Sequence, residues 1–175
     1  MDVCEVMQKA IEMEQDSQEF YKNSADKASN PLAKQTFEAL ADWEVEHAKL
    51  LRDVHDKAEA TNSCPALTEL DAEQMDMMEQ AKEIFKGALD AVDGGDVEQD
   101  PTLDDAYSIA MDKERKAIAF YKGQLDETED EAERHLYEFL LGQERGHLEL
   151  LATTEEYLND TKYWHFKEEM WMATG

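Results

Sequence analysis

Apolar residues recur at intervals of three and four positions along four long stretches of this chain, the spacing that gives an α-helix one buried face. The predicted helices cover about residues 2–28, 31–60, 100–125 and 128–158. Only short breaks separate the first helix from the second and the third from the fourth, and helices joined by short loops are usually antiparallel neighbours. The pattern therefore predicts two helical hairpins.

Capping residues mark two of the predicted helix starts. Asn30 can accept hydrogen bonds from the first amides of the second helix, and Pro31 suits the first helical position. Thr128 and Glu131 have the spacing of a capping box, which predicts the start of the fourth helix.

The connection between the hairpins spans roughly forty residues and is expected to contain a further helix at 68–92. A connection of this length can cross a bundle, so we expect an all-α four-helix bundle over residues 1–160 with one long crossover. Residues 161–175 form an aromatic C-terminal tail, which we expect to pack on the bundle.

The charge of the chain narrows the functional classes. A net charge of −26 at pH 7 opposes binding to nucleic acid or to an anionic membrane surface. No stretch approaches the ~18 apolar residues of a membrane-spanning helix, and the acidic N-terminal segment lacks a signal-peptide pattern. We therefore expect a cytoplasmic protein with no nucleic-acid or membrane partner.

The two hairpins repeat each other at an offset of one hundred residues. FYK at 20–22 recurs at 120–122, and FEAL at 37–40 recurs as YEFL at 137–140. Repeated leucines would follow from repeated helix design alone, but polar residues on the predicted inner faces repeat as well. These residues are Glu14, Glu44 and His47, repeated as Glu114, Glu144 and His147.

The spacing of these six residues predicts a pair of metal ions. A Glu and a His three positions apart project from nearly the same side of a helix. A single buried Glu or His is usually structural, but four ionised carboxylates in one core need compensation, which two dications supply. One Glu from each of two helices and a Glu-x-x-His from each of the other two form the ligand set of carboxylate-bridged di-iron bundles. Such ligands suit iron or manganese, and zinc can substitute.

Within this set we expect Glu44 and Glu144 to bridge the two metals. Glu14 with His47 and Glu114 with His147 would then complete the two ends, although the sequence does not fix this pairing. Tyr21 and Tyr121 follow two helical turns after the glutamates of the first and third helices. They would either hydrogen-bond a ligand carboxylate or pack as ordinary core aromatics, and Trp43 is expected to be a packing residue.

Four segments resemble the rubrerythrin family of the ferritin-like superfamily: EMEQDSQEFY at 12–21, ADWEVEHAKLL at 41–51, DKERKAIAFY at 112–121 and GQERGHLELL at 142–151. The resemblance implies a ferritin-like bundle with a non-haem di-iron site whose ligands are the six residues above. It also implies a reaction with hydrogen peroxide or dioxygen, often in a homodimer and often in defence against oxidants.

The chain departs from the family pattern at two points. Typical rubrerythrins end in a rubredoxin-like domain that supplies electrons, whereas this chain has only Cys4 and Cys64, which cannot form a four-cysteine iron site. We therefore expect an external electron donor such as a rubredoxin-like protein. Rubrerythrins also commonly carry an extra Glu three residues after the third-helix ligand, where this chain has Ala117.

These observations predict a di-iron oxidoreductase, a peroxidase or oxidase whose six ligands act through the metals. The alternative is iron handling by a ferroxidase or iron-binding protein, which the acidic charge favours. A hydroxylase of an organic substrate and an inert metal-sensing or scaffold protein are further alternatives.

Overall fold

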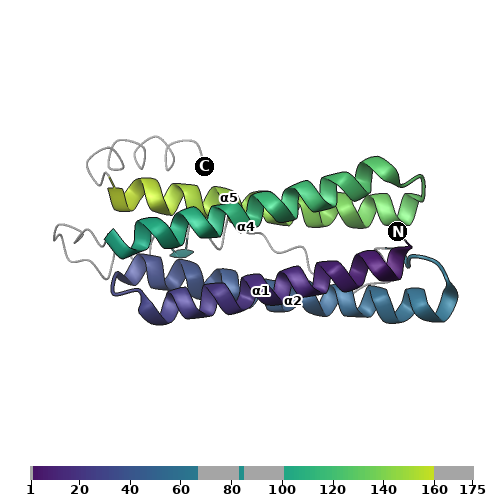
Figure 1. Ribbon diagram of the computed structural model, residues 1–175, viewed down its shortest axis with the longest axis horizontal. Coiled ribbons are helices and arrows are strands. Elements are labelled where there is room, and N and C mark those ends of the chain that lie inside the picture. The colour runs from purple at the N-terminus through teal and green to yellow at the C-terminus, as the bar shows by residue number, and fades with distance from the viewer. Residues whose placement is uncertain (1, 67–82, 85–100, 160–175) are drawn as a thin grey trace.

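The computed structural model describes residues 2–66, 83–84 and 101–159. This part of the chain contains four long helices and no strand: α1 (Val3–Lys27), α2 (Pro31–Thr61), α4 (Pro101–Glu127) and α5 (Glu131–Asn159). The four run side by side along the long axis of the molecule (Figure 1). The predicted all-α four-helix bundle is confirmed, and none of the described helices is long and apolar enough to cross a bilayer.

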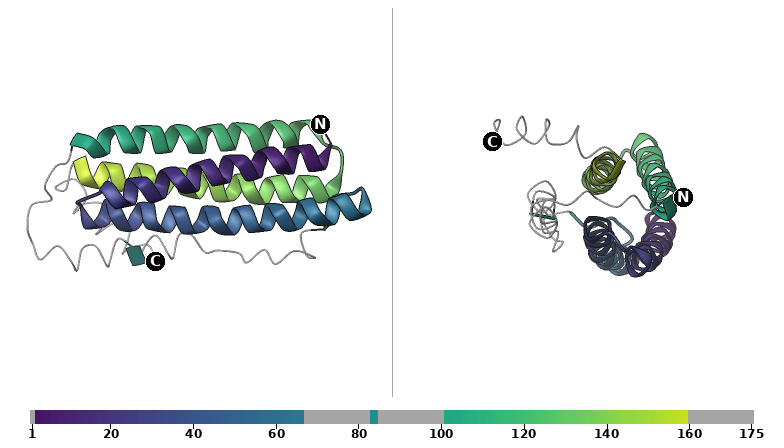
Figure 2. Two further views of the ribbon diagram at one scale, coloured as in Figure 1. Left: turned by 60° about the horizontal axis from the view of Figure 1, so that its bottom comes forward. Right: turned by 90° about the vertical axis from the view of Figure 1, so that its left-hand side faces the viewer.

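The helices pack as two hairpins, α1 with α2 and α4 with α5. Seen from the end of the bundle, α1 lies beside α4, and α2 and α5 occupy the remaining two corners (Figure 2). Direct contacts join α1 to α4 and α2 to α5. Side chains on the inner faces of all four helices can therefore meet at the bundle axis.

The starts of the first two helices follow from their capping residues. Asp2 Oδ1 accepts the Glu5 amide hydrogen at 2.9 Å, while Glu5 Oε2 accepts that of Asp2 at 3.3 Å. Asn30 Oδ1 accepts the amide hydrogens of Leu32 and Ala33 at 2.9 and 3.2 Å. These bonds satisfy amides that have no partner within the helix, and the predicted start at Asn30 is confirmed.

The predicted cap of the last helix is wrong by two residues. Asp130, not Thr128, caps α5, because its Oδ1 accepts the amide hydrogen of Glu133 at 3.0 Å. The Thr128 hydroxyl donates instead to Glu133 Oε2 at 2.7 Å. Aspartate is a stronger N-cap than threonine, and the segment offers both at the required spacing from a glutamate, so the stronger cap determines where the helix begins.

Two predicted elements lie wholly or mostly outside the described residues. The tail at 161–175 is not covered, and the helix expected at 68–92 is covered only at Glu83 and Ile84, which are helical.

The apolar core consists of two clusters. One contains Phe37, Leu40, Tyr107 and Leu151, and the other contains Met7, Leu51, Tyr121, Leu136 and Leu140. Burying each large apolar side chain contributes about 1.5–3 kcal/mol. In every helix the predicted metal ligands fall between residues of the two clusters. The bundle thus places apolar packing on both sides of a central polar layer.

Candidate metal centre

All six predicted ligands are buried at the middle of the bundle. Each has at most 2 % of its surface exposed: Glu14, Glu44, His47, Glu114, Glu144 and His147. α1 and α4 each contribute one Glu, while α2 and α5 each contribute a Glu and a His. They face inward because each lies on the apolar stripe of its helix, one or two turns from buried leucines on α2 and α5.

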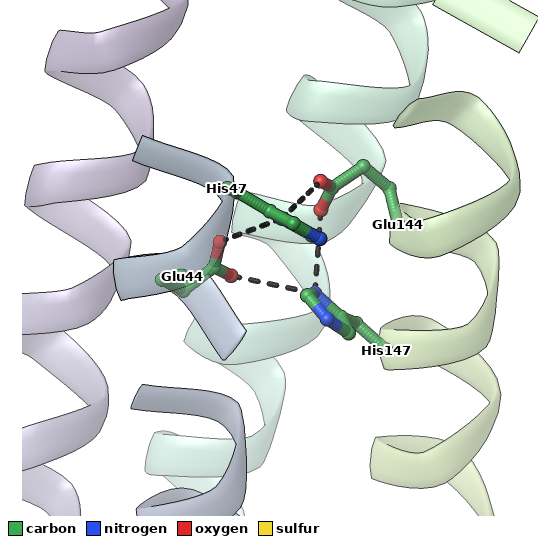
Figure 3. Close-up of side chains that lie close together, drawn as sticks. All are labelled: Glu44, His47, Glu144 and His147. Atoms are coloured by element: carbon green, nitrogen blue, oxygen red, sulfur yellow. Dashed lines mark ion pairs between the residues drawn. The ribbon is translucent and has the colours of Figure 1, made fainter. Parts of the chain in front are cut away.

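Glu44 and Glu144 each face both histidines (Figure 3). His47 Nδ1 lies 3.4 Å from Glu44 Oε2 and 3.3 Å from Glu144 Oε1. His147 Nδ1 lies 3.4 Å from the other oxygen of each carboxylate, Glu44 Oε1 and Glu144 Oε2. Each glutamate thus presents one oxygen to each histidine. This is the arrangement that a carboxylate needs in order to bridge two metal ions.

The remaining two glutamates pair with the histidine of their own hairpin. Glu14 Oε2 lies 3.7 Å from His47 Nδ1, and Glu114 Oε2 lies 3.6 Å from His147 Nδ1. Each outer glutamate therefore lies beside the histidine with which it is expected to share a metal. One half of the site belongs to Glu14 and His47, and the other half to Glu114 and His147.

The buried ligand atoms fit a pair of divalent cations. Among the described residues, both ring nitrogens of His47 and His147, both carboxylate oxygens of Glu44 and Oε1 of Glu144 lack a hydrogen-bond partner. An unsatisfied buried polar atom costs about 1–3 kcal/mol, so such atoms rarely gather without a ligand. These four side chains each offer one ligand atom within 4.8 Å of the others. Converging carboxylate oxygens and imidazole nitrogens suit iron.

Two tyrosines hydrogen-bond the outer glutamates across the hairpin boundary. Tyr21 Oη on α1 donates to Glu114 Oε1 on α4, and Tyr121 Oη on α4 donates to Glu14 Oε1 on α1. The structure thus favours the hydrogen-bonded interpretation of these residues over plain packing. The bonds cross because α1 and α4 are antiparallel. Tyr21 lies seven residues, or two helical turns, after Glu14, and the antiparallel α4 brings Glu114 within reach of its hydroxyl.

The rubrerythrin family model matches residues 5–155. The chain belongs to the rubrerythrin family. The matched span includes all six predicted ligands and both tyrosines. Searches of curated proteins and of solved structures gave no match. Family membership and the buried Glu/His cluster together indicate a rubrerythrin with a di-metal site.

Burial and mutual repulsion set the protonation of this rubrerythrin site in the absence of metal. Burial, together with the charges of Glu144 and Glu44, raises the pKa of Glu14 well above its usual value. Burial also raises the pKa of Glu114, to about 8. Burial opposes ionisation of Glu44 too, but contacts with Glu14 and His147 outweigh it and lower its pKa to about 2.

The pKa values of Glu144 and the two histidines shift in the directions that favour ion pairs between them. The pKa of Glu144 is lowered despite burial, because His147 and His47 lie beside it. Burial alone would lower the pKa of both imidazoles, but the surrounding carboxylates raise it well above the usual value. The metal-free site therefore favours protonated Glu14, Glu114, His47 and His147 beside ionised Glu44 and Glu144. Binding two dications would displace these protons.

Trp43, which was expected to be a packing residue, is buried and lies against the metal site. Its indole ring stacks on the His147 imidazole, with ring centroids 5.4 Å apart and planes 8° apart. The only signal in the sequence is its position immediately before Glu44. Which histidine it contacts depends on how the hairpins dock.

Removing one tyrosine hydroxyl is expected to weaken metal binding. Tyr21→Phe leaves Glu114 Oε1 without its donor, and the loss of such an orienting bond typically lowers metal affinity by about 10–100-fold. Tyr107→Phe is the matched control, because Tyr107 is equally buried but its hydroxyl lies near Thr36 and Thr154. Anaerobic metal titration measures both variants. Equal affinities in the two variants would contradict an orienting role for Tyr21.

Proposed function

We propose that this rubrerythrin is a non-haem di-iron oxidoreductase that reduces hydrogen peroxide or dioxygen and is re-reduced by an external electron donor. The observation that carries the proposal is the set of carboxylate oxygens and imidazole nitrogens that converge at the bundle axis without hydrogen-bond partners. When bound there, two ferrous ions would supply the two electrons that, with two protons, convert one peroxide into two water molecules.

The protein's own residues have distinct roles in this proposal. Glu44 and Glu144 would hold the two ions at a fixed separation, since each faces both halves of the site. Tyr21 and Tyr121 orient the outer carboxylates and keep a proton at each Oη. The apolar clusters on both sides exclude bulk water, which limits side reactions.

The proposal includes a separate electron donor, such as a rubredoxin-like protein. A rubredoxin-type iron site needs four cysteine thiolates, whereas this chain has Cys4 and Cys64, both of which are free thiols. We place the reaction in the cytoplasm and expect the chain to act as a homodimer.

Ferroxidase or iron-binding activity is the second candidate. The net charge of −26 concentrates cations around the protein, which favours ferrous iron as a substrate. Ala117 is buried one turn after Glu114 and cannot supply the extra carboxylate of other rubrerythrins. This difference bears on turnover with peroxide, so the oxidant has to be identified by experiment.

A mixing experiment separates these activities. The anaerobic di-iron(II) protein is mixed with hydrogen peroxide, dioxygen or excess ferrous ion, in the presence of reduced rubredoxin as donor. We expect peroxide or dioxygen to be consumed over many turnovers while rubredoxin is oxidised, and Glu44→Ala protein to show neither. Repeated oxidation of ferrous ion without rubredoxin oxidation would favour the ferroxidase. Consumption of no oxidant would refute both activities.

A further inference from the structure

The hundred-residue duplication is broken next to the bridging glutamates. The six predicted ligands and the two tyrosines are identical in both hairpins, but Trp43 precedes Glu44, whereas Gln143 precedes Glu144. The two halves of the site therefore have the same ligands in different surroundings.

The imidazole of His147 stacks against two other rings. The Trp43 indole lies with its ring centroid 5.4 Å away and an interplanar angle of 8°. The His47 ring lies with its centroid 5.1 Å away and an interplanar angle of 20°. Trp43 is itself buried, with 5 % of its surface exposed, so it cannot move away without disrupting the core. The ring plane of His147 is therefore largely determined before any ion binds.

Among the described residues, only the His147 ring stacks on the imidazole of His47. The duplication assigns Gln143 to the position that corresponds to Trp43. Gln143 is half-buried, and its Oε1 has no hydrogen-bond partner among the described residues. A glutamine at this position offers no aromatic ring for stacking, so it would restrain the His47 imidazole less than the buried indole restrains that of His147.

We propose that Trp43 is a positioning residue that makes the two halves of the site unequal, so that the half formed by Glu114 and His147 takes up its metal first. The inference rests on the proposed di-metal site and goes beyond it by assigning an order of loading. A ligand whose side chain is already restrained loses less conformational entropy on binding. The less restrained half, formed by Glu14 and His47, then binds the second ion.

Cobalt(II), which stays divalent under anaerobic conditions, is the probe. Its absorption spectrum reports both binding steps. We expect Trp43→Gln to weaken the first cobalt-binding step and to leave the second nearly unchanged. Weakening confined to the second step would overturn the order.

Trp43 and Gln143 occupy equivalent positions in the two hairpins, so exchanging their residue types gives matched control variants. Trp43→Gln gives both halves a glutamine and should weaken the first step by about 10-fold, at the lower end of the effect of residues that orient metal ligands. Trp43→Phe keeps an aromatic ring and should restore most of that affinity. Gln143→Trp gives both halves a tryptophan and should tighten the second step, a result that does not depend on how well the Trp43 variants fold.

Failure of this inference is distinguishable from failure of the metal centre. If the unaltered protein binds two cobalt ions and neither Trp43→Gln nor Gln143→Trp changes either step, Trp43 has no positioning role. If the unaltered, folded protein binds no cobalt at the core, the metal centre itself is refuted, and this inference with it.

Discussion

Replacing Glu44 by alanine is expected to lower the metal content of the iron-loaded protein from two ions per chain to at most one. Glu44 presents one oxygen to each histidine, so its removal takes a ligand from both halves of the site. Groups that only orient metal ligands contribute about 10–100-fold in affinity, and a shared ligand should exceed that range. Elemental analysis and anaerobic iron titration measure the two quantities.

The matched control is Glu46→Ala on the same helix. It removes the same charge two residues away, from a side chain that is 55 % exposed and paired with Lys49. Exposed ion pairs of this kind contribute about 0–1 kcal/mol, so Glu46→Ala should keep both ions. A Glu44→Ala protein that also kept two ions with unchanged affinity would remove Glu44 from the ligand set.

Removing the metal should destabilise the protein at neutral pH, and the deficit should shrink as the pH is lowered from about 8 to about 5. The reason is that the metal-free core buries four carboxyl groups close together, and burial, with repulsion from Glu44 and Glu144, raises the pKa values of Glu14 and Glu114. A loss of 1 kcal/mol lowers the melting temperature of a chain of this size by about 2–4 °C. Thermal melts of metal-free and loaded protein across this pH range would measure the deficit.

The sign follows from the protons held in each state. In the folded metal-free protein Glu14, Glu114 and both histidines keep protons that they would lose in the unfolded chain, where the pKa values are about 4.5 and 6.5. The stabilising contribution of groups with raised pKa values is lost as the pH rises.

Groups with lowered pKa values behave in the opposite way. Glu44 and Glu144 lose their stabilising contribution only below about pH 4.5, so they do not alter the trend between pH 5 and 8. Metal-free protein should therefore gain stability on mild acidification. A deficit that widened between pH 8 and pH 5, before any metal is released, would contradict this account.

The helices and the six candidate ligands could be predicted from the sequence because both follow from regular spacings along the chain. The three-four spacing of apolar residues defines the helices, and the repeat at one hundred residues separates Glu14, Glu44 and His47 from ordinary buried polar residues. The start of α5 was predicted wrongly. Thr128 and Asp130 can both act as an N-cap, and Asp130, the stronger of the two, caps the helix.

Contacts between side chains of different helices could not be predicted in this way. Glu14 was recognisable as a candidate ligand, but its pairing with His47, its hydrogen bond from Tyr121 and the stacking of Trp43 on His147 all needed the structure. Each of these contacts depends on the axial register of antiparallel helices. That register is determined by the packing of the two apolar clusters across the whole bundle, so only the tertiary structure decides it.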